Sequence, residues 1–297
     1  MTDREWLLFL SLLPDVGRQT LRHLLERQQV WRLAPDEVLR LPAETLRHEY
    51  RLPPRALHAL REDLSALMGE VERLEAHLTR CGVRWLSFQD AAYPHQLECM
   101  PDPPALLFLY GKYELLSEPT FALLASHTIS PEGLVELEQV AQSFLSNGWV
   151  PVVSATQPAY QRLLLCALRA NRPYILVLDR GLLRAFGDDL RREPLRQARI
   201  WQAEFDPSRA LAISPFRPRD GWVASNSRYR DALIAYLVDA PLIIEARPDG
   251  YIVQLSCELL QRGGTLSVLA HRLEQLPGNR QIIEAGGKPI GLGLGHA

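Results

Sequence analysis

The stretch Pro119–Gly133, PTFALLASHTISPEG, predicts the fold of this chain. Residues 121–124 form an apolar run typical of a strand that is buried on both faces of a parallel sheet. A polar turn follows, and Ser130 and Pro131 then supply the N-cap and the first-turn proline of a helix. This arrangement offers unpaired N–H groups to an anion at the helix N-terminus. The turn nevertheless lacks the glycines that let a phosphate approach the backbone closely.

The same alternation of strand and helix continues downstream. Strands are predicted at residues 121–125, 149–154, 173–179, 210–213, 241–245 and 265–269. Helices are predicted at residues 132–147, 158–170, 226–238 and 251–262. Strands that alternate with helices of this length indicate an α/β fold with a doubly wound parallel sheet.

Residues 1–80 have the periodicity of helices, including a long helix over residues 55–80, and are predicted to form a small helical domain. The turn within Leu13–Leu21 resembles one helix-hairpin-helix, whose amides can hold a DNA phosphate. It is equally well explained as a helix linker in which a glycine takes the left-handed conformation. Residues 81–297 form the second predicted domain, with further strands at residues 83–86 and 105–110.

The composition excludes several classes of protein. The net charge is −2 and no apolar run is long enough to span a membrane, which predicts a cytoplasmic protein. The four cysteines are scattered, which predicts reduced thiols and neither a disulfide framework nor a metal site. Arginine supplies 31 of the 33 basic residues, and residues 160–230 hold 14 arginines against 7 acids. Such arginines either contact phosphates and bases or reflect a coding bias on a solvated surface.

Several motifs together resemble the DNA-processing protein A (DprA, also called Smf) family. They are Tyr93-Pro94, the proline-rich turn Pro101–Leu107 that leads to Leu109-Tyr110-Gly111, the segment Arg230–Ala246 and the segment Pro277–Gly286. The resemblance implies an extended Rossmann-like domain behind a small N-terminal all-helical domain of the SAM or helix-hairpin-helix type. It also implies binding of single-stranded DNA, a homodimer, and loading of a RecA-type recombinase during natural transformation. It implies no catalysis, metal or cofactor.

The turns that face DNA in the family are largely replaced in this chain. The family's G-S-R turn is Ala125-Ser126-His127, and only Ser154 survives from its second turn, S-G-x-A-x-G-I-D. The family's R-N-R segment is Arg230-Asp231-Ala232, and its S-G-S turn is Asp249-Gly250-Tyr251. Arg172 stands beside the position of the family's lysine. Because each lost phosphate contact weakens binding, we expect a lower affinity for DNA.

These observations define a candidate nucleic-acid site and two alternatives to it. The alternatives are a scaffold that acts only through protein contacts and a nucleotide sensor. His127 is either a pH-tunable anion contact or an ordinary turn residue. Glu245, at the end of a strand, either faces a ligand or caps a neighbouring loop. The candidate residues are Ser126, His127, Ser130, Gly133, Ser154, Arg172, Arg217, Arg219, Arg228, Arg230 and Gly250.

Overall fold

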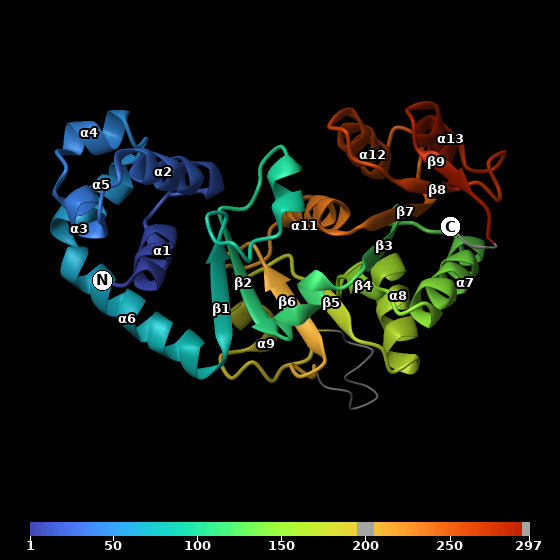
Figure 1. Cartoon of the computed structure of the whole chain (residues 1–297), viewed down its shortest axis with the longest axis horizontal. Helices are drawn as coiled ribbons and strands as arrows, with labels where there is room; N and C mark the ends of the chain where they lie inside the picture. Colours follow the sequence, from blue (N-terminus) through green and yellow to red (C-terminus); the bar gives the residue numbers. More distant parts are fainter. Residues whose placement is uncertain (195–204, 293–297) are drawn as a thin grey trace.

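The structure is a computed structural model that describes residues 1–194 and 205–292. Part of the arginine-rich segment, residues 195–204, therefore lies outside the described residues. Within the described residues, nine strands form one sheet in the order β1-β2-β6-β5-β4-β3-β7-β8-β9 (Figure 1). The strands are β1 (Val83–Ser87), β2 (Leu106–Gly111), β3 (Thr120–Ala125), β4 (Val150–Val153), β5 (Tyr174–Val177), β6 (Ala210–Ser214), β7 (Ala240–Glu245), β8 (Ser267–Leu269) and β9 (Lys288–Ile290).

The sheet is parallel over most of its width. Neighbouring strands from β6 to β9 run parallel, whereas β1 pairs with β2, and β2 with β6, in the antiparallel direction. The connection from β1 to β2 contains only a 3-10 helix, η1 (His95–Cys99), and a second one, η2 (Tyr113–Ser117), follows β2. This connection contains no α-helix of the kind that usually forms a parallel crossover, and β1 pairs with β2 in the antiparallel direction. The predicted α/β, Rossmann-like class is confirmed, with an antiparallel extension at one edge.

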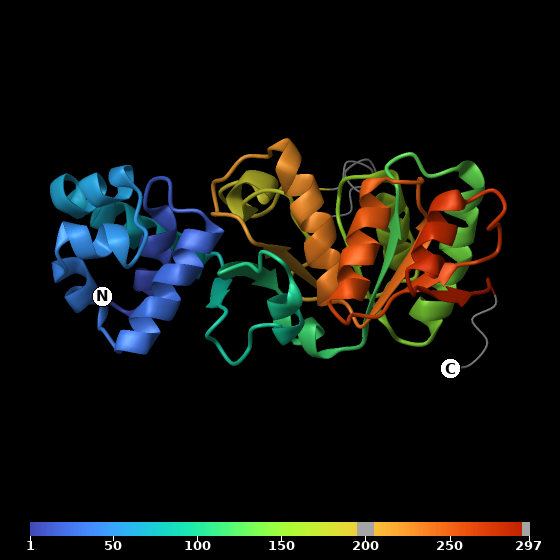
Figure 2. The ribbon, with the colours of Figure 1, turned by 90° about the horizontal axis from the view of Figure 1, so that it is seen from above.

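Helices cover both faces of the sheet (Figure 2). They are α7 (Pro131–Ser146), α8 (Pro158–Arg169), α9 (Leu182–Phe186), α11 (Ala224–Leu237), α12 (Tyr251–Gln261) and α13 (Pro277–Glu284). Every residue of β3 is buried. Phe121 and Leu123 belong to the core on the side of α7 and α8, whereas Ala122 and Leu124 belong to the core on the side of α11, α12 and α13. This alternation places β3 at the centre of both cores.

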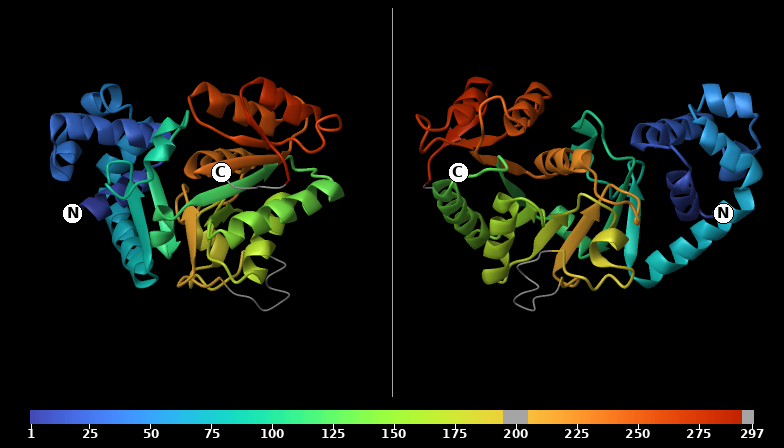
Figure 3. Two further views of the ribbon diagram at one scale, coloured as in Figure 1. Left: turned by 45° about the vertical axis from the view of Figure 1, so that its right-hand side comes forward. Right: turned by 180° about the vertical axis from the view of Figure 1, so that it is seen from behind.

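The N-terminal helices lie beyond the β1 edge of the sheet (Figure 3). They are α1 (Asp3–Leu12), α2 (Arg18–Trp31), α3 (Pro35–Arg40), α4 (Ala43–His48), α5 (Pro54–Glu62) and α6 (Leu64–Arg80). The predicted long helix over residues 55–80 is wrong, because the chain breaks at Asp63 between α5 and α6. The left-handed residue in the turn after α1 is Asp15, with φ of 59°, and Gly17 is instead the N-cap of α2.

Arg217 ties this helical part to the sheet. Its Nη2 donates hydrogen bonds to the carbonyl oxygens of Leu13 at 3.2 Å and of Val16 at 2.7 Å, in the turn between α1 and α2. Arg18, which opens α2, forms an ion pair with Asp102 at 2.8 Å. The turn that resembles a helix-hairpin-helix therefore contacts the rest of the protein through its carbonyl groups. The predicted domain boundary near residue 80 stays a prediction. One hydrophobic core includes residues from both parts.

Among the described residues, no helix is both long and apolar enough to cross a bilayer. The four cysteines carry free thiols. The cytoplasmic location stays a prediction.

Replacing Arg217 with alanine is expected to lower the free energy of unfolding by about 2 kcal/mol, because two partly buried carbonyl groups lose a charged donor. Urea denaturation measures the change. The matched control is Arg219→Ala, which removes an exposed guanidinium paired at 3.3 Å with the exposed Asp188 and should cost less than about 0.5 kcal/mol. Equal costs for the two variants would contradict the role given to Arg217.

Candidate functional site

The order of the strands places a topological switch point at β3. The chain moves from β3 through β4 and β5 to β6 on one side, and then returns to β7 on the other side of β3. In sheets of this kind, ligands bind outside the carboxyl ends of the strands at the point where the order reverses. The loops after β3 and β7, residues 126–130 and 246–250, meet at this edge.

A pocket of about 380 Å³ opens at this edge, and we call it the switch-point pocket. It lies between the loops after β3 and β7 and the first turns of α11 and α12. Residues that line it include Ser126, His127, Arg228, Arg247, Gly250 and Tyr251, with Gln157 and Asp231 also in its wall. Four predicted site residues, Ser126, His127, Arg228 and Gly250, are therefore brought together here.

Ser126 joins the two loops that form the pocket. Its amide donates to the carbonyl oxygen of Glu245 at 2.8 Å, and its Oγ accepts from the amide of Arg247 at 2.8 Å. The amide and the hydroxyl oxygen of Ser126 are thus both bonded within the protein, and the residue is buried. Ser126 sets the spacing of the loops, whereas His127 and Arg247 beside it are exposed.

The N-terminus of α7 already holds an anion, the carboxylate of Glu245. Oε1 of Glu245 accepts from the amide of Ser130 at 3.1 Å, and Oε2 accepts from the Ser130 hydroxyl at 2.5 Å. The same hydroxyl accepts from the amide of Gly133 at 2.9 Å, as an N-cap does. Arg272 lies 3.5 Å from Oε2 of Glu245 and is also paired with Glu136 at 2.6 Å. Glu245 therefore caps the neighbouring loop through Ser130, which was one of its two predicted roles.

Gly133 provides the room for this carboxylate. A Cβ atom at residue 133 would lie 2.5 Å from Oε2 of Glu245 and 2.9 Å from Cγ1 of Ile129. Because Glu245 occupies the helix N-terminus, Ser130 and Gly133 act here as supports of the turn rather than as contacts for a phosphate.

Arg230 lies in the protein interior beneath the pocket. It has no exposed surface, and its Nη2 contacts Oδ1 of Asp231 at 2.7 Å while its Nη1 lies 3.5 Å from Oδ2 of Asp179. Nη1 also donates to the Thr156 hydroxyl. Asp231 accepts further hydrogen bonds, at 3.0 Å from Tyr160 and 3.2 Å from Gln157. Burial raises the pKa of Asp231, and the positive charge of Arg230 opposes this rise.

The predicted direct contact between Arg230 and DNA is corrected by this arrangement, because a side chain without exposed surface cannot reach a ligand. Ser154 is also buried, and its Oγ lies 3.4 Å from that of Thr156. The residues that replace the family's second turn and its R-N-R segment thus contribute to a buried polar network.

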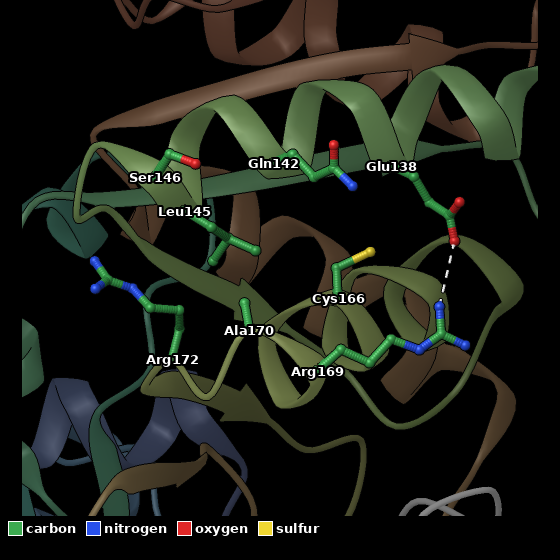
Figure 4. Close-up of a pocket in the computed structure, with 8 residues that line it drawn as sticks. All are labelled: Glu138, Gln142, Leu145, Ser146, Cys166, Arg169, Ala170 and Arg172. Carbon is green, nitrogen blue, oxygen red and sulfur yellow. Dashed lines mark ion pairs between the residues drawn. The ribbon is translucent and has the colours of Figure 1, made fainter.

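Arg172 does not belong to this edge of the sheet. It precedes β5, whereas Ser126 follows the parallel strand β3, so the two residues lie at opposite edges. Figure 4 shows Arg172 beside a different pocket of about 460 Å³ between α7 and α8, together with Cys166 and Arg169. Its predicted place in one site with Ser126 is therefore wrong.

The loop after β6 carries the two remaining arginines. Nη2 of Arg217 is engaged with the helical part, as described above. Arg219 is exposed and paired with Asp188. Strands β5 and β4 separate β6 from β3, so this loop lies apart from the switch-point pocket.

Several residues of the pocket wall are absent from the predicted site, among them Arg247, Gln157, Asp231 and Tyr251. Arg247 directly follows the strand end at Glu245-Ala246. Because ligands bind outside the carboxyl ends of parallel strands, this position alone could have identified it. Gln157 and Tyr251 carried no such signal, because each stands where the family has a small residue. No group of His, Cys, Asp and Glu side chains suited to a metal ion occurs in residues 1–194 and 205–292.

Residues 84–290 match the family described as DNA recombination-mediator protein A. The chain belongs to this family. The family predicted from the motifs at residues 93–111, 230–246 and 277–286 is thus confirmed.

Known members of the family resemble the chain in sequence and in fold. DNA processing protein DprA of Streptococcus pneumoniae is 32% identical over 110 residues, which are 36% of this chain and 39% of that protein. The chain thus spans well under half of that relative's length in sequence. The crystal structure of DprA from S. pneumoniae superposes with a TM-score of 0.69 at 21% identity, covering 98% of this chain and 95% of that one.

A structure of DNA processing protein A from Helicobacter pylori, solved to study its binding of single-stranded DNA, has a TM-score of 0.54 at 18% identity. It covers 70% of this chain and 91% of that one. At 21% and 18% identity, the two structures show that the chain shares their fold.

The replacement Gly133→Ala is expected to lower the free energy of unfolding by about 1–3 kcal/mol, because the new methyl group would overlap the carboxylate of Glu245. Thermal or urea unfolding measures this cost. The control Gly221→Ala adds a methyl group where no atom lies within 4 Å and should be neutral. A Gly133→Ala protein as stable as the control would show that the carboxylate is not held in this place.

The replacement Arg230→Met is expected to cost about 3–5 kcal/mol of stability, because it leaves two buried carboxylates without their cation. The matched control is Arg228→Met on the same helix, where the guanidinium is exposed and the cost should stay below about 0.5 kcal/mol. Denaturation curves for both variants decide whether Arg230 is structural. A small effect at Arg230 would restore it as a candidate surface contact.

Proposed function

We propose that this chain binds single-stranded DNA at the switch-point pocket and acts in DNA recombination, without catalysing a reaction itself. The observation that carries the proposal is a pair of exposed arginines, Arg228 and Arg247, in the lining of the pocket. The acid in the same wall, Asp231, is neutralised by Arg230 behind it. The lining therefore has an excess of positive charge, which favours a polyanion.

The family relationship supports the same proposal. The family is described as a recombination mediator, and the H. pylori relative is described as binding single-stranded DNA. In the proposed complex, Arg228 and Arg247 contact phosphates, and His127 lies at the same rim. Ser126 and Gly250 shape the loops, and Arg219 contacts DNA only if the strand extends to the loop after β6.

A scaffold that acts through protein contacts is the second candidate, and the carboxylate of Glu245 at the N-terminus of α7 favours it. A helix end that already holds a carboxylate offers no site to a phosphate. A homodimer and a RecA-type recombinase as partner remain proposals in both cases, and a nucleotide sensor is the third candidate. Light scattering and co-purification with a recombinase test the scaffold. A monomer without any partner would oppose it.

Fluorescence anisotropy with a labelled oligothymidylate is expected to show binding at low salt that weakens as salt rises. The double variant Arg228→Ala/Arg247→Ala should bind more weakly and lower the slope of log K against log salt by about 0.7 for each lost contact.

The matched control is Arg40→Ala/Arg47→Ala, which removes the same charge from exposed positions on α3 and α4. An equal loss of affinity for the oligothymidylate in both double variants would indicate an effect of net charge alone. Absence of binding by the unaltered protein at low salt would refute DNA binding.

A further inference from the structure

A second pocket, of about 460 Å³, lies between α7 and α8 at the amino ends of the parallel strands (Figure 4). We call it the amino-edge pocket. Both helices end there, α7 at Ser146 and α8 at Arg169, and Arg172 lines the pocket just before β5. Its volume falls within the range of small-ligand pockets. The pocket lies at the edge of the sheet opposite to the proposed DNA site, so DNA binding there does not account for it.

Arg172 is a cation without a partner in the part of the chain that the structure describes. Its Nε is buried there without a hydrogen-bond partner, and its guanidinium forms no ion pair. Two other arginines have a buried nitrogen that is not bonded, but Arg22 is paired with Glu26 and Arg27 with Glu49. A buried donor left without an acceptor is costly, and more so on a charged group. An anionic ligand would supply the missing acceptor.

The ends of the two helices do not account for Arg172 either. Basic side chains near a helix C-terminus often bind the last carbonyl groups. Here the amides of residues 147–149 donate to carbonyl groups in the last turn of α7, and those of residues 170–172 donate to carbonyl groups in the last turn of α8. The partial negative charge of the helix ends still stabilises a cation at this place. The position thus holds a guanidinium whose donors are not used by the described residues.

The one acid among the lining residues is already neutralised. Glu138 is paired with Arg162 at 2.8 Å and lies 3.9 Å from Arg169. No other acid lines the pocket in residues 1–194 and 205–292, so the charge of Arg172 is not balanced there. This excess of positive charge favours an anion.

The shape of the pocket adds an apolar surface to this cation. Figure 4 shows Arg172 and Arg169 at opposite ends, with the side chains of Leu145, Cys166 and Ala170 between them. Burial raises the pKa of the Cys166 thiol, so this surface carries no charge.

The guanidinium of Arg172 also lies beside a hydroxyl group. Its Nη2 lies against the turn after α7, 3.4 Å from the place of a Cβ atom at Gly148, two residues beyond Ser146. Nε and one Nη form a planar fork that binds two oxygens of one oxyanion. The exposed Ser146 hydroxyl, which lines the same pocket, supplies a third donor. Three donors match the three terminal oxygens of a phosphate monoester.

We propose that the amino-edge pocket binds the phosphate monoester of a small molecule, with the phosphate on Arg172 and Ser146. The apolar body of the ligand then lies on Leu145, Cys166 and Ala170. This site is separate from the proposed DNA site and does not depend on it.

Calorimetry with three simple probes tests the class of ligand. Phenyl phosphate combines the phosphate with an apolar ring, inorganic phosphate lacks the ring, and benzoate replaces the phosphate with a carboxylate. Phenyl phosphate is expected to bind about tenfold more tightly than inorganic phosphate, because part of its ring is buried against apolar side chains. It should also bind more tightly than benzoate, which has one acceptor oxygen fewer. Benzoate binding as tightly as phenyl phosphate would overturn the assignment to a phosphate.

Variants of Arg172 assign the binding to this pocket. Arg172→Met should weaken the binding of phenyl phosphate by at least about tenfold, the effect of losing hydrogen bonds to a charged group. Arg172→Lys keeps the charge without the fork and should give an intermediate affinity. The matched control is Arg40→Met, which removes an exposed arginine of α3 and should leave the affinity unchanged.

Protection of a thiol provides a second measurement in the unaltered protein. Cys166 lines the pocket, whereas Cys99 is exposed elsewhere. Phenyl phosphate is expected to slow the alkylation of Cys166 by iodoacetamide and to leave that of Cys99 unchanged, as peptide mass spectrometry measures. Equal rates at Cys166 with and without phenyl phosphate would contradict binding in this pocket.

The remaining outcomes separate this site from the alternatives. Binding of phenyl phosphate that is lost in Arg228→Ala/Arg247→Ala but kept in Arg172→Met would place the phosphate in the switch-point pocket and overturn the proposal. Arg172→Met that unfolds at a lower urea concentration than Arg40→Met would assign Arg172 a structural role instead. A loss of oligothymidylate binding in Arg172→Met would assign its phosphate to DNA, which would also overturn the proposal.

Discussion

The carboxylate of Glu245 at the N-terminus of α7 is the contact on which the rest of the candidate site depends. It links the end of β7 to the turn after β3, and with the hydrogen bonds of Ser126 it fixes the distance between the two loops that enclose the pocket. The turn needs no glycine at residue 125, because none of residues 125–130 has a positive φ.

The local features of the fold were predictable because they depend on neighbouring residues. The buried run at Phe121, the N-cap Ser130 and the proline at residue 131 all act within one strand or one helical turn, and the structure has them as the sequence indicated. The break at Asp63 was not predictable in this way. Residues on both sides of it have helical periodicity, and only packing against the other helices decides that α5 and α6 separate.

The sequence could not show which arginines are bonded inside the protein and which are exposed, because this depends on residues far away in the chain. Arg217 binds carbonyl groups near the N-terminus, and Arg230 meets Asp179 across the interior. In the sequence these residues look the same as the exposed Arg228 and Arg247. The misplacement of Arg172 was avoidable, since a residue that precedes a parallel strand lies at the edge opposite to one that follows its neighbour.

The β9 edge limits how two copies of this protein could associate. Lys288 donates its amide to Leu266 in the sheet, so the next residue, Pro289, turns its nitrogen outward, where it has no hydrogen to donate. A charged residue and a proline on an edge strand prevent a further strand from pairing with it. Among the described residues, this edge is therefore unsuited to a continuous intermolecular sheet. Any dimer would have to form through helical surfaces or through another part of the molecule.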